Sequence, residues 1–141
     1  YLVEKQNLKV NIDERFDERR FGIPNTEVYP NCYSLQYLDE NFKTVGGECQ
    51  KEVRERFEEA FKEVLNFNRG KRIAIFAHGY SITFFLMKWL KLEGVNEERK
   101  LTFSFHHEII FDKKLDAPEV FKLVIDDNVI EISNLEVDYS I

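Results

Sequence analysis

The chain has 141 residues, a length typical of one domain, and 43% of them are apolar, including 13 phenylalanines, which excludes disorder as its main state. Lys and Arg number 20 against 26 Asp and Glu, so the net charge is −6 and the composition lacks the basic footprint of nucleic-acid binding. The least charged run, Ile73 to Leu90, is broken by polar residues and by Gly79, which excludes a membrane-spanning segment. Two cysteines, Cys32 and Cys49, are too few for a disulfide framework, so we expect a reducing, cytoplasmic location.

The N-terminal part predicts little regular structure. Tyr1 to Gln6 is typical of the end of a helix, and Lys9 to Ile12 of a short strand. Gly22 to Gly47 is the longest irregular stretch, and a connection of this length in a compact domain is usually a functional loop or lid. An ordered surface loop packed by its own aromatic side chains is the alternative. A homodimer interface is a third use for these aromatic residues.

Two helices flank a buried strand in the middle of the chain. From Lys51 to Leu65, apolar residues recur on one face at helical spacing, which predicts an amphipathic helix. Arg72 to Ala77 is a continuous apolar, partly β-branched run, as in strands buried on both faces of a parallel sheet. Ser81 to Leu92 is apolar nearly all round, so we expect a deeply buried helix that ends at Gly94.

The C-terminal third changes to strand-like alternation. The expected strands are Leu101 to Phe105, Glu108 to Asp112, Val120 to Ile125 and Val129 to Ile132. A helix, a buried strand, a second helix and then edge strands indicate an α/β fold. We predict a three-layer α/β/α sandwich with a mostly parallel sheet and antiparallel strands at its C-terminal edge.

The turn His78-Gly79 is the most informative candidate for chemistry. Ligands of open α/β sheets bind at the carboxyl ends of strands, and the start of a helix attracts anions through its free N–H groups. His78 adds an imidazole that can donate to phosphate, act as a base or bind a metal. Gly79 lets a ligand approach the backbone. A purely structural histidine in such a turn is the alternative.

Two other patterns suggest different chemistry. Gly79-Tyr80-Ser81 resembles part of the hydrolase nucleophile elbow, but position 83 is Thr and no Asp lies between Ser81 and the next histidines, so a helix-capping hydroxyl is favoured for Ser81. His106 and His107 are adjacent, and adjacent strand residues point to opposite faces, so they do not form a metal cluster together. No H-E-x-x-H or C-x-x-C pattern is present, and we predict no metal site.

Three segments, taken in order, resemble the histidine phosphatase superfamily, which has the phosphoglycerate mutase-like fold. Glu18 to Gly22 (ERRFG) resembles the family's E-R-x-(Y/F)-G segment, Gly46 to Cys49 (GGEC) its G-G-E-S helix start, and Ala77 to Gly79 (AHG) its S-H-G turn. Together with the helix and strand between them, the resemblance extends from Tyr1 to Asn128. It implies a single histidine-phosphatase-like domain over residues 1–141.

The resemblance also implies roles for individual residues. Glu18 matches the general acid that protonates the leaving oxygen and later activates water, and His78 matches the histidine that contacts the transferring phosphoryl group. Arg19, Gly79 and Tyr80 match positions expected to bind substrate or phosphate. Phosphoryl transfer needs positive donors around the equatorial oxygens. The implied partner is a small phosphorylated substrate, and no cofactor is implied.

The family's nucleophilic histidine lies in an R-H-G motif on its first strand, and a phosphate-binding arginine follows in the next helix, but neither occurs here. We therefore expect the domain to lack its first roughly fifty residues, a strand-and-helix unit, and to be inactive alone. The implied function of the parent protein is hydrolysis of a small phosphomonoester through a phosphohistidine intermediate. A phosphoglycerate mutase is one alternative, although Tyr80 stands where mutases typically have Asn. A non-catalytic pseudophosphatase or binding domain is the other.

Overall fold

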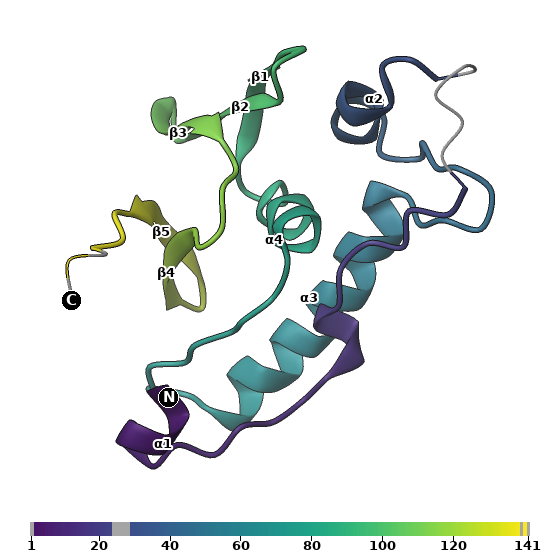
Figure 1. Ribbon diagram of the computed structural model, residues 1–141. Helices are drawn as coiled ribbons and strands as arrows, with labels where there is room; N and C mark the ends of the chain where they lie inside the picture. Colours follow the sequence, from purple (N-terminus) through teal and green to yellow (C-terminus); the bar gives the residue numbers. More distant parts are fainter. Residues whose placement is uncertain (1, 24–28, 139, 141) are drawn as a thin grey trace.

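A computed structural model describes residues 2–23, 29–138 and 140, which form helices and two small sheets (Figure 1). The helices, with the 3-10 helix named η1, are α1 (Leu2–Gln6), η1 (Glu14–Phe16), α2 (Cys32–Leu38), α3 (Gln50–Phe67) and α4 (Gly79–Leu86). The strands are β1 (Lys91–Val95), β2 (Lys100–Phe105), β3 (Glu108–Lys114), β4 (Val120–Asp126) and β5 (Asn128–Leu135).

Both sheets are antiparallel. Strands β1, β2 and β3 pair in chain order, and β4 pairs with β5 in a separate two-stranded sheet. His106 and His107 form the turn between β2 and β3, with positive φ values of 49° and 69°, so they lie in a tight exposed turn and not on a strand face. The expected three-layer α/β/α sandwich with a mostly parallel sheet is therefore wrong for the described residues, although the four C-terminal strands are confirmed.

The segment Arg72 to Ala77 explains this difference. We expected a buried parallel strand there, but the segment is extended and pairs with no strand of the described chain. Phe76 is 81% exposed and Ile73 is 39% exposed. In Figure 1 the segment runs alone from the end of α3 to the start of α4. Strand pairing needs a neighbour that supplies hydrogen bonds, so apolar composition alone could not establish the parallel sheet.

Helix α3 confirms the helix expected from Lys51 to Leu65. Its apolar face is buried at Val53, Phe57 and Ala60, and the Phe57 ring stacks on Phe85 of α4 with centroids 4.4 Å apart. Aromatic pairs of this kind add to the hydrophobic stabilisation of a core. This contact joins α3 to the last turn of α4, the helix that begins after the His78-Gly79 turn.

Helix α4 is shorter than expected and ends at Leu86 instead of Leu92. Backbone N–H groups of Trp89 and Leu90 both bond to the Leu86 carbonyl, at 2.9 and 2.8 Å, in a turn that buries Leu90 before β1 begins. Gly94 lies beside a bulge within β1 and does not end the helix. An apolar turn that leads into a strand has the same composition as a continuing helix, so periodicity alone misplaced this boundary.

The N-terminal expectations are mixed. Helix α1 confirms a helix before Asn7, with Tyr1 outside the described residues. The strand expected at Lys9 to Ile12 is absent from the described structure, and Ile12 is 92% exposed. The stretch Gly22 to Gly47 contains α2, and its residues 24–28 lie outside the described part. No helix among the described residues combines the length and the apolar character needed to cross a membrane.

Candidate functional site

The segments Glu18 to Gly22 and Gly46 to Cys49, the first two motifs of the sequence, lie side by side. The Glu48 N–H donates to the Arg20 carbonyl at 2.8 Å, and Gly22 faces Val45 and Gly47. A Cβ atom at Gly22 would lie 2.4 Å from the Val45 carbonyl oxygen and 2.5 Å from the Gly47 nitrogen, and the φ of Gly22 is +68°. Both the space and the backbone conformation therefore require glycine at this position.

The Glu18 carboxylate lies at the start of α4. It accepts hydrogen bonds from the N–H groups of Tyr80 (3.2 Å) and Ser81 (3.0 Å), and from that of Arg19 (2.8 Å). A carboxylate in this position satisfies N–H groups that the helix leaves unpaired and complements the helix dipole. The structure thus brings Glu18, predicted from the first motif, to the helix that follows the His78-Gly79 turn.

His78 precedes the first residue of α4 and occupies its N-cap position, with an exposed side chain. Its backbone N–H and carbonyl both bond to the Ser81 hydroxyl, at 3.3 and 3.1 Å. Ser81 is fully buried, so its hydroxyl stabilises the helix start and is not available as a nucleophile. This supports the capping role expected for Ser81, although from the third helical position and not from the N-cap itself.

Arg56 of α3 holds the loop that carries Glu18. Its guanidinium donates to three backbone carbonyls of this loop, those of Arg15 (2.7 Å), Asp17 (2.9 Å) and Glu18 (3.1 Å). It also donates to both carboxylate oxygens of Glu48, at 3.0 and 3.1 Å. Sequence reasoning missed Arg56; the available signal was its spacing of about two helical turns from Glu48.

Glu48 is buried beneath this loop and is only 5% exposed. Burial by itself would raise the pKa of Glu48, but the hydrogen bonds from Arg56 and from the Arg20 N–H outweigh it and hold the pKa below its ordinary value. Glu48 therefore stays ionised and anchors the cation that positions the Glu18 loop. The sequence analysis assigned this residue no such role.

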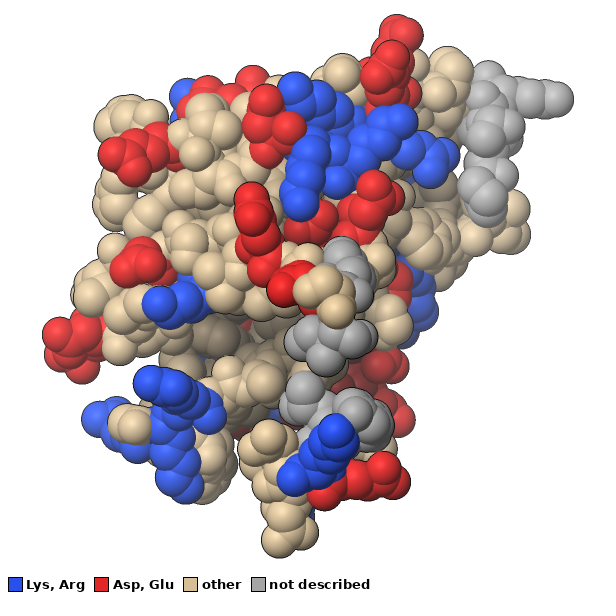
Figure 2. All heavy atoms as spheres, turned by 60° about the vertical axis from the view of Figure 1, so that its left-hand side comes forward, with Lys and Arg blue, Asp and Glu red and all other residues tan. Residues whose placement is uncertain are grey.

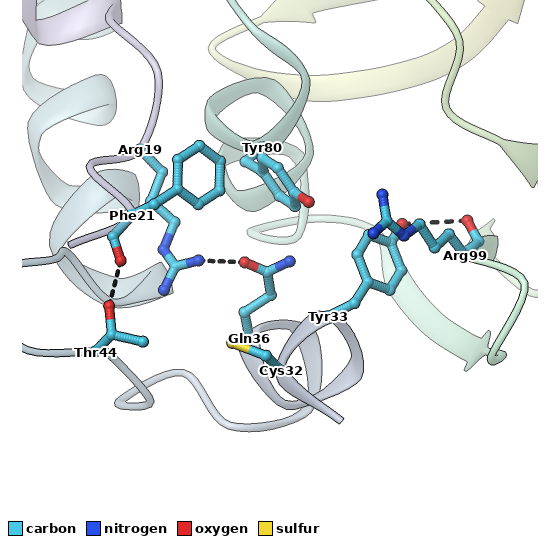
Figure 3. A pocket seen from close by; sticks show the side chains of 8 residues that line it. All are labelled: Arg19, Phe21, Cys32, Tyr33, Gln36, Thr44, Tyr80 and Arg99. Carbon is cyan, nitrogen blue, oxygen red and sulfur yellow. Dashed lines mark hydrogen bonds between the residues drawn. The ribbon is translucent and has the colours of Figure 1, made fainter. Parts of the chain in front are cut away.

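Arg19 is nearly fully buried, with 3% exposure. Its Nε donates to the Glu48 carbonyl at 2.6 Å and its Nη1 to the Gln36 Oε1 atom, whereas its Nη2 has no hydrogen-bond partner among the described residues. Burial lowers the pKa of Arg19, and nearby groups oppose that shift. The side chain lines a cavity of about 160 Å³ together with Tyr33, Tyr80 and Arg99 (Figure 3).

A second, larger cavity of about 370 Å³ adjoins the first, because both are lined by Tyr33, Tyr80 and Arg99. Glu18 and Gly79 line this second cavity. Three of the predicted site residues, Glu18, Gly79 and Tyr80, therefore share one cavity. Arg19 lines the adjoining one, and His78 flanks the pair at the start of α4 without lining either.

The charges of the molecule are mixed on the face shown in Figure 2, where Lys and Arg side chains form small groups next to Asp and Glu. Within residues 2–23, 29–138 and 140, no group of three or more His, Cys, Asp or Glu side chains is placed to hold a metal ion. The charged groups that line the two cavities are the carboxylates of Glu18 and Asp116, the ammonium group of Lys114 and the guanidinium groups of Arg19 and Arg99.

The two adjoining cavities, lined by Glu18, Asp116, Lys114, Arg19 and Arg99 beside the start of α4, form the candidate functional site. Comparison with family models gives a match to the histidine phosphatase superfamily (branch 1) over residues 1–103. Because this match spans most of the chain, the protein belongs to the histidine phosphatase superfamily. Membership suggests phosphatase or mutase activity. Comparisons with curated proteins and with solved structures found no match.

Proposed function

We propose that this domain is part of a phosphatase that hydrolyses a small phosphomonoester through a phosphohistidine intermediate. The observation that carries the proposal is the position of Glu18, whose carboxylate lies on the first N–H groups of α4 in the cavity that Gly79 also lines. Family membership supports phosphoryl transfer as the chemistry. An acid beside a helix start suits a reaction in which a phosphoryl group leaves an oxygen.

In the proposed reaction, a histidine nitrogen attacks phosphorus and the bond to the leaving oxygen breaks. Glu18 donates its proton to that oxygen, and then takes a proton from the water that hydrolyses the phosphohistidine. His78 stabilises the charge on the equatorial oxygens, while the N–H groups of Tyr80 and Ser81 hold the carboxyl group of Glu18 beside the reacting centre. Tyr80 and Arg19 orient the rest of the substrate.

We further propose that the nucleophilic histidine belongs to a segment upstream of Tyr1. The support is the exposed, unpaired segment Arg72 to Ala77, which has the apolar composition of a central strand and offers its edge for pairing. On this proposal residues 1–141 alone lack the nucleophile and are inactive. Both cysteines are free, which suits a reducing cytoplasmic compartment.

The test compares the full-length protein with the 141-residue chain, using p-nitrophenyl phosphate and an alkyl phosphate. We expect phosphate release by the full-length protein only, without added 2,3-bisphosphoglycerate. The Glu18→Gln variant should slow hydrolysis of the alkyl phosphate more, because its leaving oxygen needs the proton. Glu14→Gln, which neutralises an exposed carboxylate of η1, is the matched control.

Three outcomes contradict the proposal in different ways. Equal slowing of both substrates by Glu18→Gln argues against Glu18 as the acid. Strict dependence on 2,3-bisphosphoglycerate with an isomerised product identifies a mutase. No phosphate release by the full-length protein from any phosphomonoester leaves a binding domain as the function.

A further inference from the structure

The larger cavity has to offer positive charge to a phosphoryl group, because phosphoryl transfer places negative charge on the equatorial oxygens. The start of α4 supplies little of it, since the N–H groups of Tyr80 and Ser81 already donate to the Glu18 carboxylate. We propose that Lys114, the last residue of β3, binds the oxygens of the reacting phosphoryl group in this cavity. The role in the reaction rests on the proposed function, whereas the anion site can be tested by binding alone.

Two carboxylates and two cations of the described residues line this cavity. The carboxylates of Glu18 and Asp116 repel a phosphoryl group when they are ionised. The guanidinium carbon of Arg99 lies 5.5 Å from the centre of the Tyr33 ring, and Arg99 also lines the smaller cavity. Lys114 lines the larger cavity only, so it is the cation placed to offset the repulsion there.

Lys114 has no carboxylate partner in the described part of the chain, unlike two lysines beside it. Lys113 contacts Glu119 at 2.9 Å. Lys100, the cross-strand partner of Lys114, contacts Asp112 at 3.0 Å. Adjacent residues of a strand point to opposite faces, so Lys113 and Lys114 differ in what they face although they are neighbours. Lys114 is exposed, and its ammonium group is therefore available for a ligand.

Leu115, the next residue, holds the end of β3 against the start of α4. A Cβ atom at Gly79 would lie 2.8 Å from the Cδ2 atom of Leu115, so Leu115 fills the space beside this glycine. Leu115 is half-buried and packs against the hydrophobic core. This contact brings the backbone of Lys114 close to the His78-Gly79 turn without use of the lysine side chain. Replacement of that side chain should therefore leave the fold unchanged.

The test measures the affinity of the 141-residue chain for inorganic phosphate by isothermal titration calorimetry. Lys114→Gln should weaken binding about tenfold, as the loss of one charge-assisted contact does. Lys114→Arg should keep most of the affinity, because the positive charge remains. Glu18→Gln should strengthen binding, because a negative charge leaves the same cavity, and this change shows that phosphate lies beside Glu18.

Lys113→Gln is the matched control, because it removes the same charge from the adjacent position, where the lysine contacts Glu119. Its phosphate affinity should equal that of the native chain. Equal affinities of Lys114→Gln and the native chain overturn the proposal, as does an equal loss in Lys113→Gln. An unchanged affinity in Glu18→Gln also overturns it, since the ion then lies outside this cavity, and so does the absence of phosphate binding by the native chain.

The proposed phosphatase is tested separately. If the full-length protein releases no phosphate from any phosphomonoester while Lys114→Gln still weakens phosphate binding, the phosphatase is refuted and the anion site is retained. If the full-length protein releases phosphate while Lys114→Gln leaves phosphate binding unchanged, the role of Lys114 is refuted and the phosphatase is retained.

Discussion

Removal of Arg56 should destabilise the fold and loosen the Glu18 loop, although Arg56 lines neither cavity. Its guanidinium joins α3 to three carbonyls of that loop and to both oxygens of Glu48. Arg56→Met keeps much of the side-chain volume and removes every one of these donors. The change therefore isolates the charge and the hydrogen bonds from packing.

The size of the effect follows from the burial of Glu48. This carboxylate is 5% exposed, and its ion pair with Arg56 has a nitrogen–oxygen distance of 3.0 Å. Breaking a buried pair by removal of one partner costs about 3–5 kcal/mol, because a charge stays buried without compensation. Glu48 keeps the Arg20 N–H at 2.9 Å and a longer contact to the Arg20 guanidinium at 3.5 Å. We therefore expect a loss of about 3 kcal/mol in the free energy of unfolding, the lower end of that range.

The assay is urea unfolding followed by circular dichroism, with Arg54→Met as the control from the same helix. Arg54 pairs with Glu40 at 2.5 Å on the exposed side, where an ion pair contributes less than about 1 kcal/mol. The double variant Glu48→Gln/Arg56→Met should lose less stability than the sum of its single variants, since no unpaired charge remains. A loss in Arg56→Met no larger than that in Arg54→Met would refute the reasoning, and so would strict additivity in the double variant.

Two further predictions concern the junction of the first two motifs. Gly22→Ala should lower the free energy of unfolding by more than about 2 kcal/mol in the same urea assay, because φ is +68° and the new Cβ would meet the Val45 carbonyl. The control is Gly46→Ala, where φ is +76° but the space is open, and there the free energy of unfolding should fall by only about 1–2 kcal/mol. Burial of Glu48 opposes its ionisation, but hydrogen bonds from Arg56 and from the Arg20 N–H hold the pKa of Glu48 in the folded state below the ordinary 4.5. The ionised carboxylate therefore stabilises the fold fully above pH 4.5, and this contribution is lost as the pH falls through the folded-state pKa. Thermal melts from pH 3 to 7 should show a shallower acid loss in Glu48→Gln than in the native chain, and equal slopes would contradict the assignment.

Helix α3 was predictable because its signal is local, whereas α2 was not predicted and the end of α4 was misplaced. Apolar spacing located α3 to within two residues at each end, and burial of Val53 and Phe57 confirms the face that it indicated. Arg72 to Ala77 carried an equally strong apolar signal, but a strand also depends on a partner elsewhere in the chain. The parallel sheet was therefore wrong, because no residue within that segment reports whether a neighbouring strand is present.

Sequence reasoning likewise predicted some residues of the candidate site and missed others. The resemblance indicated Glu18, Arg19, His78, Gly79 and Tyr80. Glu18, Gly79 and Tyr80 line one cavity and Arg19 lines the adjoining one, but His78 lines neither. Arg56 and Arg99 were missed, because their contacts with the Glu18 loop and with Tyr33 join residues that are distant in sequence. Arg99 lies among the charged residues of a loop, where a solvated cation and a cation stacked on Tyr33 have the same local sequence.

The distribution of ion pairs bears on how the proposed phosphorylated substrate binds to a chain with a net charge of −6. Arg15 contacts Asp13, Glu59 and Glu63, Arg54 contacts Glu40 and Arg56 contacts Glu48, so carboxylates neutralise these three arginines. Arg19 and Arg99 face a cavity without a carboxylate in its lining. Exposed charges more than a Debye length apart are largely screened, so the potential in that cavity depends on these guanidinium groups and on the nearby Glu48, Glu18 and Asp116 more than on the net charge. Salt should therefore weaken binding of the proposed phosphorylated substrate less than it weakens association driven by surface charge.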